Sequence, residues 1–74
     1  MPDTEVRIRT DFKASTRAMA GGLAYHASES ESKAALAQIG PGDTYAETWI
    51  RDHPDSNWRL ESVEHLGHTE RTSA

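Results

Sequence analysis

The chain has no cysteine, few aromatic residues and no long apolar run. Without cysteine, neither a disulfide framework nor a thiolate metal site supplements the core, and the absence agrees with a reducing compartment. No run approaches the ~20 apolar residues that span a membrane. Residues 1–5 lack the positive and apolar regions of a signal peptide. These absences predict a cytoplasmic protein with no membrane partner.

Hydrophobic residues make up only 35% of the 74 residues, and the formal net charge is −4. A chain of this size forms one domain and buries only about 60% of the surface that its unfolded form exposes. We therefore expect either a small core or a core that a partner or a second copy completes. The negative charge opposes general nucleic-acid binding, because that binding draws most of its affinity from neutralising phosphates.

The clearest strand covers residues 5–12, where apolar or β-branched residues alternate with Arg7, Arg9 and Asp11. Such alternation is typical of a strand with one solvated face. We expect residues 1–4 to be a disordered lead-in, residues 5–66 to form a single α+β domain, and residues 67–74 to be a flexible tail.

Residues 13–27 are rich in alanine and place Met19, Leu23 and Ala27 four positions apart, which favours a helix. The pair Gly21-Gly22 interrupts this pattern. The alternative is therefore a glycine hairpin turn between two short strands. Because alanine has a poor strand propensity, we predict the helix, bent at the glycines.

A second helix is predicted to follow Ser28. Ser28 and Glu31 have the spacing of a capping box, in which each side chain bonds the backbone N–H of the other residue. The run that ends at Ile39 has helical composition, and Gly40 and Pro41 then stop the helix.

Residues 44–63 predict a β-hairpin, and its second strand is expected to run to His65 or Leu66, where Gly67 ends it. The first part is rich in β-branched and aromatic residues, residues 52–57 are turn formers, and the next residues alternate apolar with charged side chains. Pairing these arms places Trp49 opposite Leu60, with Tyr45 on the same face.

These elements predict an α+β fold with a small three-stranded, mostly antiparallel sheet in β-α-α-β-β order and helices packed on one face. Two alternatives stay open: residues 45–53 form a short helix, or the hairpin register slips by one residue and exposes an aromatic patch. The expected core consists of the apolar residues taken to face the helices, which are Val6, Ile8, Phe12, Leu23, Leu36, Ile39, Trp49, Trp58 and Leu60.

The sequence carries no catalytic or cofactor motif. It has no Gly-x-Ser-x-Gly elbow and no glycine-rich phosphate loop, and so short a chain leaves little room for a pocket of several hundred Å³. His65 and His68 stand three apart, but Gly67 separates them, which favours solvated histidines over a metal site. We therefore expect a non-enzymatic protein without a metal or cofactor.

Three arginines, Arg7, Arg9 and Arg59, are expected to share the open face of the sheet with Glu61 and are the candidate partner-binding residues. The first hypothesis is a protein-binding module that inhibits or modulates a host protein, as small acidic accessory proteins of phages and mobile elements do. Protein binding follows by elimination, because the sequence has no catalytic signature, metal cluster, membrane segment or strong basic patch. The link to phages and mobile elements is a general expectation for small acidic proteins and follows from no residue of this chain. The alternatives are a nucleic-acid-associated protein that uses the same arginines, and a self-associating structural protein that forms a homodimer.

Overall fold

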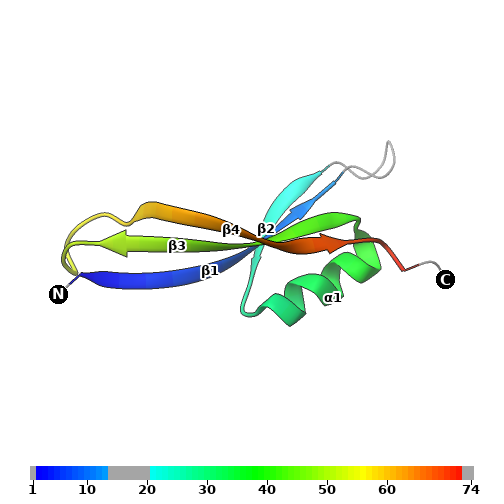
Figure 1. Ribbon diagram of the computed structural model, residues 1–74, viewed down its shortest axis with the longest axis horizontal. Helices are drawn as coiled ribbons and strands as arrows, with labels where there is room; N and C mark the ends of the chain where they lie inside the picture. The colour runs from blue at the N-terminus through cyan, green and yellow to red at the C-terminus, as the bar shows by residue number, and fades with distance from the viewer. Residues whose placement is uncertain (1, 14–20, 73–74) are drawn as a thin grey trace.

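The computed structural model describes residues 2–13 and 21–72. These residues form five elements: β1 (Asp3–Phe12), β2 (Gly22–His26), α1 (Glu29–Ile39), β3 (Gly42–Arg51) and β4 (Arg59–Thr69). All four strands belong to one antiparallel sheet in the order β2-β1-β3-β4. The molecule is elongated, 49 × 22 × 16 Å, because the ribbon of β1, β3 and β4 extends well beyond the helix (Figure 1).

The expected three-stranded sheet in β-α-α-β-β order is wrong, because the described residues hold four strands and one helix. Residues 22–26, which we expected in a helix over 13–27, form β2 and pair with Ile8–Phe12 of β1. Residues 14–20 of that expected helix lie outside the described residues. Pairing with β1 supplies the backbone partners of β2, and this tertiary contact overrides the weak strand propensity of its residues.

The helix α1 begins and ends where the sequence predicts. The Ser28 hydroxyl accepts a hydrogen bond from the Glu31 N–H at 3.2 Å. The Glu31 carboxylate accepts from the N–H of Ala27 at 3.2 Å, one residue before the expected donor. The Gly40 N–H donates to the Leu36 carbonyl at 2.7 Å, and the chain turns away at Pro41.

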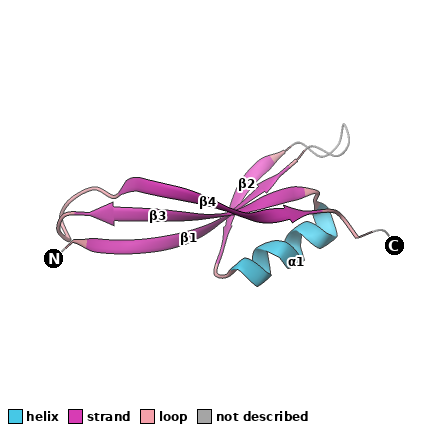
Figure 2. Cartoon of the chain, viewed as in Figure 1, coloured by secondary structure: helices cyan, strands magenta, loops and turns pink. Residues whose placement is uncertain are grey.

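The helix packs on one face of the sheet, over the half that includes β2 (Figure 2). Leu36 is the one apolar side chain that is fully buried in the described residues. It lies on Gly42, where a Cβ atom would overlap with Leu36 and with the Asp11 carbonyl. Beside it, the buried Ser32 hydroxyl bonds Thr10 Oγ1 at 2.5 Å and Thr44 Oγ1 at 2.9 Å. The buried centre under α1 therefore contains one apolar side chain, Leu36, beside three polar side chains, Thr10, Ser32 and Thr44.

The register of β1 with β3 decides which side chains lie on each face. The two strands pair without interruption from Asp3 opposite Arg51 to Phe12 opposite Gly42. Because directly opposite residues share a face, Thr10 and Thr44 lie under α1, whereas Trp49 lies with Glu5 on the opposite face.

The expected core is therefore wrong. Of its nine residues only Leu36 is buried, and Val6, Leu23, Ile39 and Leu60 are exposed. Trp49 lies on the face that α1 does not cover, because its register partner in β1 is Glu5.

The predicted hairpin is confirmed, since β3 and β4 pair with Trp49 opposite Leu60. Two register shifts interrupt this pairing, between Thr44 and Tyr45 and between Thr48 and Trp49. The alternative helix over 45–53 is wrong, because these residues lie in β3 and the turn that follows it.

The sheet extends beyond residues 5–66 at both ends. It begins at Asp3, and β4 continues through Gly67 to Thr69. Gly67 has φ +140°, a conformation that favours glycine. After the strand, the Thr72 N–H donates to the Ala37 carbonyl of α1 at 2.6 Å. Within residues 2–13 and 21–72, no helix is long and apolar enough to cross a membrane.

Candidate functional site

The sheet face opposite α1 is open, and we call it the arginine–aromatic face. Each of its three guanidinium groups stacks on a ring at 4.4–4.6 Å from the ring centroid: Arg7 on Trp49, Arg9 on Tyr45, and Arg51 on Trp58. Arg7 also lies 5.9 Å from the Trp58 ring. Such cation–π contacts hold the long arginine side chains flat along the sheet.

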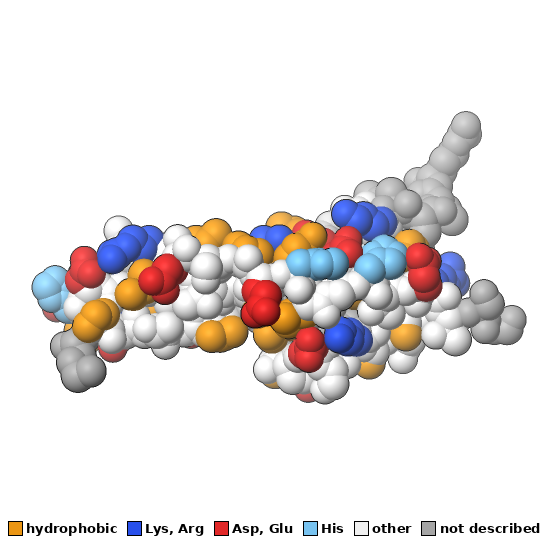
Figure 3. All heavy atoms as spheres, viewed as in Figure 1, with side chains coloured by type: hydrophobic (Ala, Val, Ile, Leu, Met, Phe, Trp, Pro, Cys, Tyr) orange, Lys and Arg blue, Asp and Glu red, His pale blue; other side chains and the backbone are white. Residues whose placement is uncertain are grey.

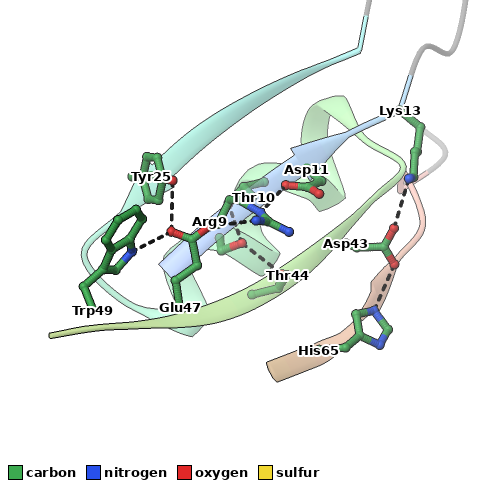
Figure 4. A network of polar contacts seen from close by, with 11 residues as sticks. Arg9, Thr10, Asp11, Lys13, Tyr25, Asp43, Thr44, Glu47, Trp49 and His65 are labelled. Atoms are coloured by element: carbon green, nitrogen blue, oxygen red, sulfur yellow. Dashed lines mark hydrogen bonds and ion pairs between the residues drawn. The ribbon is translucent and has the colours of Figure 1, made fainter. Parts of the chain in front are cut away.

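Glu47 lies at the centre of this face and is only 3% exposed. Its carboxylate accepts three hydrogen bonds: from Arg9 Nη1 at 2.7 Å, from Trp49 Nε1 at 2.9 Å and from the Tyr25 hydroxyl at 3.0 Å. Figure 4 shows the three donors converging on it from β1, β3 and β2. Glu47 therefore joins three strands through one buried charge.

The donors around Glu47 control its protonation. Burial raises the pKa of the carboxyl, but the hydrogen bonds from Trp49, Tyr25 and Arg9 together outweigh burial and hold the pKa below its ordinary value of 4.5. The hydrogen bond to the same carboxylate raises the pKa of the Tyr25 hydroxyl. At neutral pH the face therefore contains a carboxylate anion and a neutral phenol.

Every arginine of the arginine–aromatic face already has an acidic partner. Arg7 pairs with Glu5 at 2.6 Å, Arg9 with Glu47 at 2.7 Å, and Arg51 with Asp3 at 2.7 Å. The register places two further carboxylates, Asp11 and Asp43, on the same face. On the side of the molecule that Figure 3 shows, acidic and basic side chains are interspersed and neither kind forms a continuous patch. The charges of the face therefore compensate one another.

Exposed apolar side chains concentrate on this same face. The described residues contain six large hydrophobic side chains that are exposed, and four of them have register partners on the arginine–aromatic face. These four are Leu23, Tyr25, Leu60 and Val63.

A second polar cluster is centred on Asp43. Its Oδ1 accepts from His65 Nε2 and from His68 Nδ1, both at 3.1 Å, and Lys13 Nζ lies 3.5 Å from Oδ2. Burial opposes ionisation, but the bonds from His65 and His68 lower the pKa of Asp43. Hydrogen bonds to Glu70 and to Asp43 raise the pKa of His68.

We call this group around Asp43 the histidine cluster. It was not predicted, because Asp43 lies far from His65 and His68 in the sequence and because His68 was expected in the flexible tail. The pairing of β3 with β4 brings these residues together, and His65 packs on Tyr45 with the ring centroids 5.1 Å apart. In the part of the chain that the structure describes, no group of three or more histidines and carboxylates is arranged to hold a metal ion.

The structure separates the four predicted site residues. Arg7 and Arg9 lie side by side on the arginine–aromatic face. Arg59 is the register partner of Ile50, on the other face, and it bonds Asp52 at 3.2 Å. Glu61 lies at the register shift between Leu60 and Ser62, where it has no partner in β3.

Sequence reasoning did not identify Arg51, Glu47 or Tyr25 as parts of the site. A signal was present for two of them, since the alternation of Tyr45, Glu47, Trp49 and Arg51 places all four on one face of any strand. Tyr25 carried no such signal, because β2 was expected to be helical.

No family model matches the chain, and neither the curated proteins nor the solved structures contain a significant match to it.

Proposed function

We propose that this chain is a non-enzymatic protein-binding module that docks its partner on the arginine–aromatic face. One observation carries the proposal: four exposed apolar side chains share that face with stacked arginines and tryptophans. Tryptophan, tyrosine and arginine are the residue types enriched in interface hot spots. Clustered apolar side chains on a small soluble domain typically mark an interaction site.

The charges of the face indicate the chemistry of the partner. Because Arg7, Arg9 and Arg51 already have carboxylate partners, an acidic ligand must first displace those carboxylates. Rings and ion pairs also hold these side chains in place before binding, which lowers the entropy lost on association. We therefore propose a partner surface that is apolar and carries few charges. Modulation of a host protein, as by phage accessory proteins, is one form of this proposal, which rests on what small acidic proteins commonly do.

The test is affinity capture from a lysate of the source organism with two matched variants, after nuclease treatment. Leu60→Glu adds a charge to the arginine–aromatic face, and Ile39→Glu adds the same charge to α1, at a position of equal 46% exposure. We expect Ile39→Glu to retain the partner and Leu60→Glu to lose it, with both circular dichroism spectra unchanged. Retention of the partner by folded Leu60→Glu would exclude this face.

A second candidate is binding of single-stranded nucleic acid, because arginines and aromatic rings interleave on a sheet face. Single-strand binding proteins use rings for stacking and cations for the backbone. The compensated arginines and the net charge of −4 favour the protein-binding proposal. Titration with a labelled oligonucleotide separates the two: binding at low salt that weakens steeply as salt rises would favour the nucleic acid.

A further inference from the structure

The edge of the sheet at β1 is only half paired. Strand β2 pairs with Ile8–Phe12, and its last residue, His26, lies opposite Ile8. In the described residues, Asp3–Arg7 pairs on one side alone, with β3. Figure 1 shows this half of β1 along the outer side of the ribbon, away from β2 and α1. Backbone N–H and C=O groups along such an edge can accept another strand.

This open edge has a defined length. At one end β2 occupies the edge from Ile8 onward. At the other end Pro2 has no backbone N–H and cannot continue a ladder. Five residues, Asp3–Arg7, are therefore available, and an added strand has to fit between these two limits.

A second copy of the same segment fits this window in one antiparallel register. Centring the pair on Glu5 places Asp3 opposite Arg7 of the second copy, and Thr4 opposite its Val6. The added ladder ends at this point, because His26, the last residue of β2, already occupies the position opposite Ile8. Shifting the centre to Val6 would push Thr4 and Asp3 of the second copy into the positions that His26 and Tyr25 occupy.

Charge and exposure on the edge agree with this register. Both outer pairs place Asp3 beside Arg7 of the other copy, and opposite charges on directly facing residues stabilise a sheet. Each of these residues already has a partner in its own copy, Arg51 for Asp3 and Glu5 for Arg7, so the facing charges extend these ion pairs across the interface. The side chain of Val6 is 60% exposed and would pack beside Thr4 of the second copy. The central pair of Glu5 residues is the one unfavourable contact, and each Glu5 keeps its own Arg7 at 2.6 Å.

The other edge of the sheet is less suited to pairing. The strand β4 at that edge is longer than the open segment Asp3–Arg7, but two register shifts interrupt the pairing of β4 with β3. Bulges twist an edge strand and hinder regular addition of another strand. By contrast, β1 pairs with β3 without interruption over its whole length and presents a regular edge.

We infer that two copies of this chain associate through antiparallel pairing of Asp3–Arg7, with Glu5 facing Glu5, to form one continuous sheet. This interface uses the edge of β1. It engages Asp3, Glu5 and Arg7 at the border of the arginine–aromatic face and leaves the rest of that face open in each copy. It does not depend on the proposed partner, and the test below is read on the purified chain.

The first experiment uses the absence of native cysteine. Facing residues at the centre of an antiparallel pair have Cα atoms about 4.5–5.5 Å apart, within reach of a disulfide. We expect Glu5→Cys to form a disulfide-linked dimer under mild oxidation roughly tenfold or more faster than Glu64→Cys, because association raises the local thiol concentration. Glu64 is an exposed glutamate on the opposite edge strand and gives the matched control. Equal rates for the two folded variants would overturn the inference.

Sedimentation equilibrium of the wild-type chain gives an independent measurement. We expect a reversible monomer–dimer equilibrium that Glu5→Gln tightens by roughly two- to fivefold, because the facing like charges are removed. Arg7→Glu should weaken it, since glutamate would then face Asp3 of the second copy. A wild-type chain that stays monomeric at millimolar concentration, or a dimer insensitive to both substitutions, would contradict this pairing.

Discussion

Replacing Glu47 by glutamine tests whether a buried carboxylate, rather than an apolar core, holds the strands together. The substitution keeps the size of the side chain and removes its charge. One carboxylate oxygen becomes an NH₂ group, which is a donor and cannot accept from Arg9, Tyr25 or Trp49. The least costly orientation turns the NH₂ toward Arg9, because Arg9 keeps a second bond to Asp11 at 2.8 Å.

The expected cost follows from that orientation. Losing one charge-assisted hydrogen bond costs about 1.5–3 kcal/mol, and the partial exposure of Arg9 lets water restore part of it. We therefore expect Glu47→Gln to lower the free energy of unfolding by about 2 kcal/mol. For a domain of this length, that loss lowers Tm by roughly 8–16 °C.

Urea denaturation at one fixed protein concentration, followed by tryptophan fluorescence, measures this loss. Glu64→Gln is the matched control, because Glu64 is exposed on β4 and its replacement should change stability by less than about 0.5 kcal/mol. The pH dependence adds a second check. The pKa of Glu47 is lowered in the folded chain, so its stabilisation is present above its ordinary value of 4.5 and is lost as the pH falls through the folded pKa. A Glu47→Gln variant as stable as Glu64→Gln at neutral pH would refute the reasoning.

Two further variants probe the helix-covered face and the histidine cluster. Ser32→Ala removes the buried hydroxyl that bridges two buried threonines, and we expect a loss of about 1–3 kcal/mol in urea denaturation, against little change for the exposed Ser30→Ala. Bonds to Glu70 and Asp43 raise the pKa of His68, so its stabilisation is full below the ordinary value of 6.5 and is lost as the pH rises through the folded pKa. His68→Gln should therefore flatten the dependence of Tm on pH across that range, and a Tm profile identical to that of the wild-type chain would contradict this.

Local features of the fold were predictable from local sequence patterns. The alternation of Val6 to Phe12 identified β1, the Ser28 and Glu31 spacing located the start of α1, and the turn formers at 52–57 located the hairpin. Each of these signals acts within a few residues, where backbone geometry and capping chemistry dominate. Trp49 opposite Leu60 was also correct, because a short hairpin loop fixes the register of its arms.

The register between β1 and β3 could not be predicted from local patterns. About thirty residues separate the two strands in the sequence, so no turn fixes which residues face each other. A shift by one residue would have placed Trp49 opposite Val6, which is the arrangement that the expected core required. The observed register instead puts Trp49 opposite Glu5. It lets Glu47 bond Arg9 and lets Ser32 reach both Thr10 and Thr44. The observed register therefore satisfies polar contacts between distant segments, and it places Trp49 on the face opposite α1.

The candidate site was predictable only in part, for the same reason. Arg7 and Arg9 were identified because they alternate with apolar residues along one strand. Arg59 was grouped with them because Trp49 and Leu60 were expected to face the helices. Arg59 pairs with Ile50, as the predicted hairpin requires, but the pairing of β1 with β3 puts Trp49 on the face of Arg7 and Arg9 and leaves Arg59 on the other face. The register shift at Glu61 affects only Glu61 and the residues of β4 after it, and no pattern in the sequence around Glu61 predicts such a bulge.

The arginine–aromatic face combines two roles that most domains separate. With Leu36 alone fully buried among the apolar residues described, much of the support for the sheet comes from Glu47 and from arginines stacked on rings. The same rings are half-buried, and the neighbouring Tyr25 and Leu60 are exposed and can contact a partner. A partner that covers this face would exclude water and so strengthen its hydrogen bonds and ion pairs. Binding at this face should therefore also raise the free energy of unfolding of the chain. A partner on this face is thus expected to raise the Tm of the chain, whereas pairing at the edge of β1 leaves this network exposed.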